Sequence, residues 1–134
     1  SSSAASDVYK RQERRGRMVF YRLNVKEPTV RQFKAFVNVY TLKHLVDMLK
    51  QHSRRIILFG SCSQGTDVKG SDLDLFVLTS EKAYARGKIS EFNRKSERKI
   101  APIVVDANEF ASLRREDKPL YENVQRGITL WETE

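Results

Sequence analysis

The stretch from Ile56 to Thr79, IILFGSCSQGTDVKGSDLDLFVLT, decides the fold. It begins with a short apolar run of strand type, which Gly60 and Ser61 bring to an end. A second strand pattern follows over residues 71–78, and its alternation places Asp72 and Asp74 on one face. The stretch therefore predicts a strand–turn–strand unit that carries two neighbouring carboxylates.

These two carboxylates indicate a cation site. Side by side on a strand, Asp72 and Asp74 repel each other unless a cation lies between them. Hard divalent ions such as Mg²⁺ take oxygen ligands of this kind and bring substrate phosphates with them. Gly60 allows the backbone to approach a phosphate closely, and Ser61 offers a hydroxyl and an amide at a predicted helix N-terminus. Gly65 is expected to let that helix pack tightly against the sheet.

The order of these elements resembles the DNA-polymerase-β-like nucleotidyltransferase superfamily, and most closely its minimal nucleotidyltransferase domains. The family pattern is an apolar strand, Gly-Ser, a short helix with a glycine, and Ser-Asp-apolar-Asp-apolar; here these are LFGS, SCSQG and SDLDL. The resemblance extends from Ile56 to Trp131, where GITLWE is similar to the family's C-terminal Gly-Ile-x-Leu stretch. It implies an α/β (α+β) fold, with a short mixed sheet flanked by helices.

The resemblance also implies an activity. Family members of this kind transfer a nucleoside monophosphate from a Mg²⁺-bound nucleoside triphosphate to an acceptor, and pyrophosphate leaves. In the family's two-metal site, Asp72 and Asp74 are the expected metal ligands and catalytic acids. Gly60, Ser61 and Ser71 are the expected nucleotide-binding residues. Protein, nucleic acid and small molecule all stay open as the acceptor.

A third carboxylate is expected in the family, on the strand next to the acidic pair. That strand is predicted at residues 100–105, and the family position falls near Ala101 or Pro102, neither of which can serve. Asp106 follows at the strand's end and is a candidate catalytic acid. However, Asp106-Ala-Asn-Glu109 is also typical of a capping box, and we favour the cap. The alternative function is a DNA-binding transcriptional regulator whose nucleotidyltransferase-like domain binds nucleotide with weak or no turnover.

Positive charge is concentrated ahead of the acidic pair. Residues 13–55 contain eleven Lys and Arg against three Asp and Glu, a balance of +8, whereas residues 56–134 contain twelve against thirteen, a balance of −1. Nucleic acid is the usual partner of such a basic segment, because neutralising phosphates releases counterions. A solvated basic surface without a partner is the alternative.

An N-terminal hairpin and a helical linker are predicted within this basic segment. RRGRMVFYRLN (14–24) indicates a hairpin tip at Gly16 and a strand over 17–23. Such an Arg-flanked hairpin resembles the wing of a winged helix-turn-helix domain, with Arg15 and Arg17 as candidate DNA contacts. A helix is expected to begin at Pro28, with a kink or break near Thr41. Its apolar set recurs at helical spacing: Val30, Phe33, Val37 and Tyr40.

The chain is accordingly divided into four parts. Residues 1–12 are expected to be disordered, and residues 2–12 resemble the translation of a transposase-based sequencing adapter, which makes them foreign to a longer natural protein. Residues 13–27 are the wing remnant, 28–55 the helical linker and 56–134 the nucleotidyltransferase domain. A homodimer through the helical linker is a further expectation.

Composition excludes several classes of protein. No run approaches the ~18 apolar residues of a membrane span, so no membrane partner is expected. No basic-then-apolar leader is present, so secretion is not expected. The single cysteine, Cys62, fits a reducing cytoplasm and is interpreted as a packing residue. His44 and His52 have no partner at ligand spacing and are not expected to bind metal.

Overall fold

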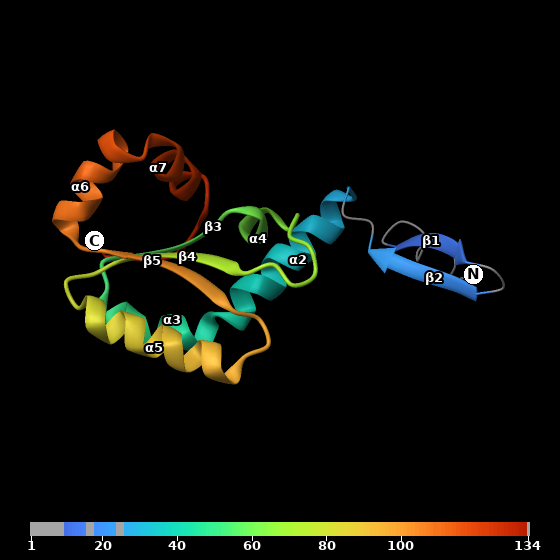
Figure 1. Ribbon diagram of the computed structural model, residues 1–134, viewed down its shortest axis with the longest axis horizontal. Helices are drawn as coiled ribbons and strands as arrows, with labels where there is room; N and C mark the ends of the chain where they lie inside the picture. The colour runs from blue at the N-terminus through green and yellow to red at the C-terminus, as the bar shows by residue number, and fades with distance from the viewer. Residues whose placement is uncertain (1–9, 16–17, 24–25, 134) are drawn as a thin grey trace.

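The computed structural model describes residues 10–15, 18–23 and 26–133. Its body is a four-stranded sheet in the order β5-β4-β3-β6, with helices on both faces (Figure 1). Strand β4 runs antiparallel to β3 and parallel to β5, and β6 runs antiparallel to β3. This is the short mixed sheet that the sequence predicts. The strands are β3 (Arg55–Phe59), β4 (Leu73–Leu78), β5 (Ile100–Val105) and β6 (Ile128–Glu132).

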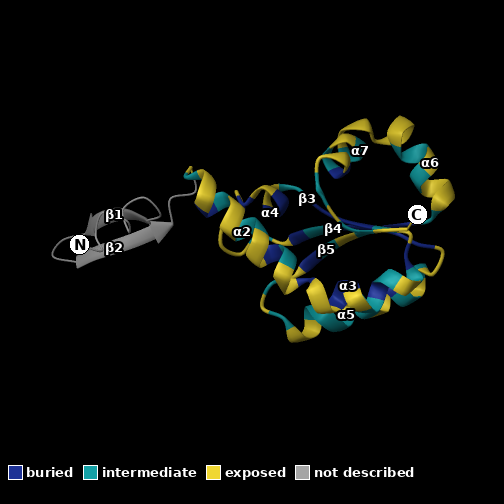
Figure 2. Cartoon of the chain, turned by 180° about the vertical axis from the view of Figure 1, so that it is seen from behind, coloured by how far each residue is buried: buried dark blue, intermediate teal, exposed yellow. Residues whose placement is uncertain are grey.

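Two pairs of helices cover the sheet. Helices α3 (Lys43–Leu49) and α5 (Lys82–Lys95) lie on one face, and α6 (Ala107–Glu116) and α7 (Lys118–Gln125) on the other (Figure 1). Alternating side chains of β4 fill the two cores, because successive residues point to opposite faces. Figure 2 shows the buried positions concentrated in the strands and in the helix faces turned toward them. On the α3/α5 side these residues are Leu73, Leu75 and Val77; on the α6/α7 side, Phe76 and Leu78.

The predicted break in the N-terminal helix is confirmed. Helix α2 (Pro28–Thr41) ends one residue before Leu42, the N-cap of α3, and a 3-10 turn, η1 (Lys50–His52), follows. Leu42 and Leu49 are fully buried in the core that α3 shares with β3 and β4. The expected domain boundary at residue 56 therefore does not coincide with a break in the core, because α3 covers an apolar face that the sheet would otherwise expose.

Helix α2 packs against α4 (Ser61–Gln64), the single turn that follows β3. A Cβ at Gly65 would lie 1.8 Å from the carbonyl oxygen of Arg31 in α2, and Gly65 also has a φ of +70°. The expectation that Gly65 brings α4 against the sheet is thus wrong: the glycine lets α2 approach. Of the apolar set of α2, Val30 is buried, whereas its other members are exposed: Phe33, Val37 and Tyr40.

The N-terminal hairpin forms a separate sheet of two antiparallel strands, β1 (Lys10–Arg15) and β2 (Met18–Leu23). Gly16, the predicted tip, and Arg17 lie outside the described residues, as do residues 1–9. The expected disorder of residues 1–12 does not hold for residues 10–12, because they pair with β2 through the backbone. The longest described helices, α2 and α5, have 14 residues each, and no described helix is both long and apolar enough for a bilayer span.

Candidate functional site

Asp72 and Asp74 lie at the start of β4. Asp74 is the second residue of the strand and is half-buried, whereas Asp72 precedes the strand and is exposed. Burial, and then the negative charge of Asp72, raise the pKa of the Asp74 carboxyl above its ordinary value. The two acids are therefore close enough to repel each other, and a cation between them would remove that repulsion.

The turn at Gly60 lies directly against Asp74. Phe59 is in register with Asp74 across the β3–β4 ladder, so the chain leaves β3 beside this carboxylate. A Cβ at residue 60 would lie 2.4 Å from Oδ2 of Asp74, and the φ of +73° is one that residues with side chains rarely adopt. The backbone angle favours glycine, and any side chain here would also displace the Asp74 carboxylate. The structure thus brings the predicted phosphate-binding turn and the acidic pair together.

The two serines of the predicted nucleotide site have different surroundings. Ser61 is the first residue of α4 and is exposed beside Gly60. Ser71 is half-buried, and its Oγ accepts a hydrogen bond of 3.2 Å from the backbone N–H of Val68. The N–H of Ser71 donates in turn to the carbonyl of Val68 at 3.0 Å. Ser71 therefore closes the turn that leads to Asp72, and a direct contact with nucleotide stays a prediction.

No acid lies beside the pair on β5. Ala101 is in register with Asp74, and Pro102 with Leu75, in the parallel β4–β5 ladder. Alternation places Ala101 on the same face as Asp74, and neighbouring strands are ~4.8 Å apart. Position 101 is therefore the place from which a third carboxylate would reach Asp74. This register agrees with the position expected from the sequence, where alanine stands instead.

Asp106 caps a helix at the other end of β5. It follows Val105, so roughly 16 Å of strand separates it from Ala101. Its Oδ1 accepts a 2.8 Å hydrogen bond from the N–H of Glu109, whose carboxylate accepts one of 3.1 Å from the N–H of Asp106. The bond from the Glu109 backbone, and then the charge of Lys82 at 3.6 Å, lower the pKa of Asp106. The predicted capping box is confirmed, and Asp106 is not placed to be a third catalytic acid.

Comparisons with known proteins agree with this arrangement. The sequence model of the family described as "Nucleotidyltransferase domain" matches residues 41–128, about two thirds of the chain. The chain belongs to this family. The match defines the nucleotidyltransferase domain and begins at residue 41, before the expected boundary at residue 56. It therefore includes α3, in agreement with the core that α3 shares with β3 and β4.

Two solved structures are similar to the nucleotidyltransferase domain. One is a "putative nucleotidyltransferase from Sulfolobus solfataricus", with 16% identity over 77% of this chain and 87% of that chain and a TM-score of 0.49. The other is a mutant of the toxin-antitoxin MntA-HpeT, with 25% identity over 72% of this chain and 74% of that chain and a TM-score of 0.49. At these TM-scores neither likeness adds to the argument. No curated protein matches the chain.

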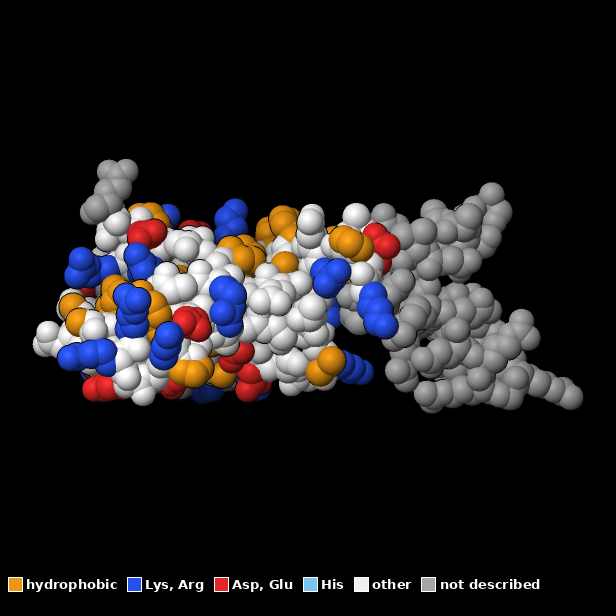
Figure 3. All heavy atoms as spheres, turned by 90° about the horizontal axis from the view of Figure 1, so that it is seen from above, with side chains coloured by type: hydrophobic (Ala, Val, Ile, Leu, Met, Phe, Trp, Pro, Cys, Tyr) orange, Lys and Arg blue, Asp and Glu red, His pale blue; other side chains and the backbone are white. Residues whose placement is uncertain are grey.

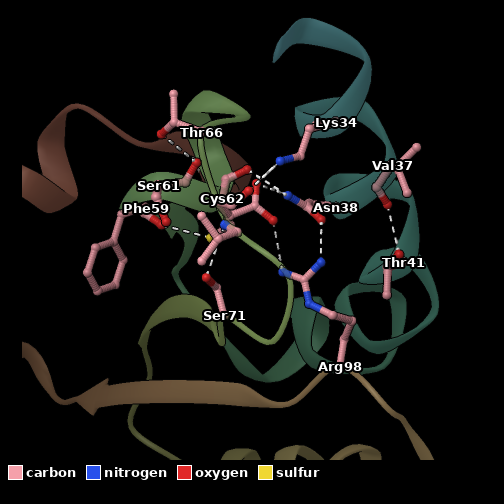
Figure 4. A network of polar contacts seen from close by, with 12 residues as sticks. Lys34, Val37, Asn38, Thr41, Phe59, Ser61, Cys62, Thr66, Ser71 and Arg98 are labelled. Carbon is pink, nitrogen blue, oxygen red and sulfur yellow. Dashed lines mark hydrogen bonds and ion pairs between the residues drawn. The ribbon is translucent and has the colours of Figure 1, made fainter. Parts of the chain in front are cut away.

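A buried ionic cluster that the sequence does not reveal connects the nucleotidyltransferase domain to α2. Asp67 is 4% exposed, and its carboxylate accepts hydrogen bonds of 3.3 Å from both Asn38 of α2 and Arg98 of the loop before β5 (Figure 4). Lys34 of α2 lies 3.8 Å from the same carboxylate and donates to the Asp67 carbonyl. Asn38 also binds the carbonyl of Cys62 at 3.0 Å. The cluster ties α2 to the loop that leads to the acidic pair.

The remaining candidates have structural surroundings. Cys62 is fully buried, its Sγ donates to the carbonyl of Phe59, and burial raises the pKa of its thiol, so it is a packing residue as expected. His44 is exposed, and His52 contacts Glu81 at 3.0 Å. In the part of the chain that the structure describes, no group of three or more His, Cys, Asp or Glu side chains is placed to hold a metal. Arg15 ends β1.

We expect Asp74→Asn to stabilise the metal-free domain at neutral pH. The raised pKa means that the folded state binds the Asp74 proton more tightly than the unfolded chain does, so ionisation of Asp74 opposes folding above that pKa. Asparagine keeps the shape and removes the charge. In the presence of a chelator, the melting temperature of the variant should exceed that of the wild type. The difference should shrink as the pH falls through the raised pKa, where wild-type Asp74 becomes protonated.

The control for this comparison is Glu97→Gln, which removes a negative charge at an exposed position in the loop before β5. It should change the melting temperature little. A variant Asp74→Asn that melts below the wild type at neutral pH would contradict the repulsion described above.

Proposed function

We propose that this domain binds a Mg²⁺-bound nucleoside triphosphate and transfers its nucleoside monophosphate to an acceptor hydroxyl. The contact of Gly60 with Asp74, next to Asp72, carries the proposal: a backbone turn open to phosphate adjoins two carboxylates that repel each other. An adjacent pair of carboxylates suits a hard cation, and Asp72 and Asp74 would hold it. Once bound, Mg²⁺ would neutralise phosphate charge and orient the triphosphate.

The roles of the other residues follow from their positions. Gly60 holds the turn against the Asp74 carboxylate, and the exposed Ser61 beside it would bind the β- and γ-phosphates through its hydroxyl and amide. Transfer forms a bond from the acceptor oxygen to the α-phosphorus, releases pyrophosphate, and requires a base for the acceptor's proton. Because Ala101 stands where an acid would assist, we expect slow turnover; general base catalysis is typically worth about 10²–10⁴-fold.

A second candidate function is favoured by the same alanine. If the domain binds triphosphate without turnover, it acts as a nucleotide sensor within a DNA-binding regulator. The two functions share the binding site and differ only in whether pyrophosphate is released.

Binding should require both carboxylates. Without the cation, Asp72, Asp74 and the triphosphate are all negative and repel one another. We expect Asp72→Asn and Asp74→Asn each to weaken Mg²⁺-dependent binding of nucleoside triphosphate by tenfold or more, which is about 1.4 kcal/mol, in titration calorimetry. Glu97→Gln serves as the charge-matched control. Equal affinities for the wild type and both Asn variants would refute the proposed site.

Restoring the missing acid should restore turnover. Ala101→Asp places a carboxylate in register with Asp74 and on the same face. We expect pyrophosphate release from nucleoside triphosphate to increase by about 10²-fold, at the lower end of the value of general base catalysis. Ala101→Asn is the matched control, since it has the same size without a base. Asp106→Asn should leave the rate unchanged, because Asp106 caps α6.

If Ala101→Asp binds triphosphate as tightly as the wild type and still releases no pyrophosphate, the sensor is the better description. A fall in the transfer rate of Asp106→Asn, at an unchanged melting temperature, would instead restore Asp106 as the third acid.

We also propose that the N-terminal hairpin, rather than the helical linker, is the segment that contacts DNA. Several linker cations are already paired: Lys34 with Asp67, Lys50 with Asp47 at 3.6 Å, and Arg55 with Glu132 at 2.6 Å. On the face that Figure 3 shows, basic side chains are spread among acidic and hydrophobic ones and form no single patch.

DNA binding by this hairpin should be sequence-independent and should weaken as salt rises. We expect Arg15→Ala combined with Arg17→Ala to lower DNA affinity and to reduce the slope of log affinity against log salt by about 2, one unit for each lost phosphate contact. Arg114→Ala with Arg115→Ala, on α6, is the control with the same loss of charge. An unchanged salt slope in the hairpin variant would exclude these arginines as the contact.

A further inference from the structure

One face of α2 presents apolar side chains to solvent. Phe33, Phe36 and Tyr40 are 64%, 62% and 66% exposed, and Val37 is 42% exposed. The rings of Phe36 and Tyr40 stack on each other, with centroids 6.1 Å apart. These four residues are called the α2 stripe below. Phe36 and Val37 are three and four residues after Phe33, and Tyr40 is four and three residues after them, so all four lie on one side of the helix.

The α2 stripe carries no charge. Between residues 32 and 41 its only other exposed neighbours are Gln32 and Thr41. The one cation in this part of the helix, Lys34, is turned to the other side, where it meets Asp67. Nucleic acid would require several cations on the surface that contacts it. The stripe has none, and in the groove beside it Lys43 is accompanied by Asp47. An apolar, uncharged surface favours a protein partner with a matching apolar surface.

The spacing of the stripe is self-complementary. In an antiparallel pair of α2 helices, Phe33 of one copy lies opposite Tyr40 of the other, and Phe36 lies opposite Val37. The twofold axis then passes between residues 36 and 37, so each of these side chains is also near its own counterpart. An isologous contact of this kind uses the same surface on both copies and closes after two, so no longer assembly results. Neither copy would bury a charge at the centre of the contact.

The stripe supplies much of the area that a specific interface needs. An aromatic side chain buries about 150–250 Å², so three rings exposed by about two thirds, with Val37, offer roughly 400 Å² per copy. Two copies would bury roughly 800 Å² through the stripe alone, against about 1,000 Å² for a specific interface. An open groove beside the stripe adds further area on each copy. Phe36 and Tyr40 share it with Val46 and Leu130, and also with Lys43 and Asp47, one charge of each sign.

We propose that the chain forms a homodimer through antiparallel packing of the α2 stripes of two copies. The dimer does not depend on nucleotide binding or transfer. In each copy, Lys34 and Asn38 of α2 contact Asp67. The dimer contact therefore lies on the opposite side of α2 from the cluster that anchors the loop before Asp72.

The mass of the whole chain in solution tests the proposal. Sedimentation equilibrium at micromolar concentration should give twice the monomer mass of 15.6 kDa. The double variant Phe36→Asp with Tyr40→Asp should sediment as a monomer, because it would bury four negative charges at the contact. Val68→Asp is the matched control: Val68 is 72% exposed but lies in the loop before Ser71, and the variant should remain dimeric. A wild-type monomer, or a double variant that remains dimeric, overturns the proposal.

Crosslinking tests the arrangement without charged substitutions. The native Cys62 is fully buried and gives little background with a short bis-maleimide. Val37→Cys should link to itself across the twofold axis. Phe33→Cys alone should not, but a mixture of Phe33→Cys and Tyr40→Cys should link the two proteins to each other. If Phe33→Cys links to itself as readily as Val37→Cys, the antiparallel arrangement is wrong.

Discussion

The contact between the Asp74 carboxylate and the backbone of Gly60 is the constraint on which the site depends. Strands β3 and β4 are antiparallel, so the last residue of β3, Phe59, lies opposite Asp74 near the start of β4. The carboxylate lies where a side chain at residue 60 would be, and the φ of +73° at this position also favours glycine. Burial and the charge of Asp72 raise the pKa of Asp74, which shows that this position disfavours the ionised acid. The domain thus retains a repulsion between Asp72 and Asp74 that a bound cation would relieve.

Local signals made much of the fold predictable. β4 alternates between two apolar faces, and the starts of the last helices carry side-chain caps: Asp106 accepts from Glu109, and Asp117 from Leu120 at 3.2 Å. The sequence could not show which apolar helix face is buried against the rest of the chain and which is left exposed to solvent. The helical spacing of the α2 residues correctly indicated a helix, but spacing alone cannot show whether a core lies opposite. The same limit applies to α3, whose packing into the sheet places it with the domain and not with a linker.

The candidate site divides in the same way. Gly60, Asp72 and Asp74 lie within one short stretch, so their juxtaposition follows from a strand, a turn and a strand. Asp67 belongs to the same stretch, but its partners Asn38 and Arg98 are 29 and 31 residues away in opposite directions. No local pattern connects them. Only the folded chain shows that α2 and the loop before β5 together anchor the segment that ends at Asp72.

Pro102 has a consequence for how copies of this chain can meet. β5 is an edge strand, and a proline within it has no N–H to offer to a further strand. The outer side of β5 is therefore a poor template for a further strand. This protects the molecule against aggregation by edge-to-edge pairing of sheets. At the end of the sheet where Asp74 lies, Pro102 is consequently exposed and Ala101 only half-buried.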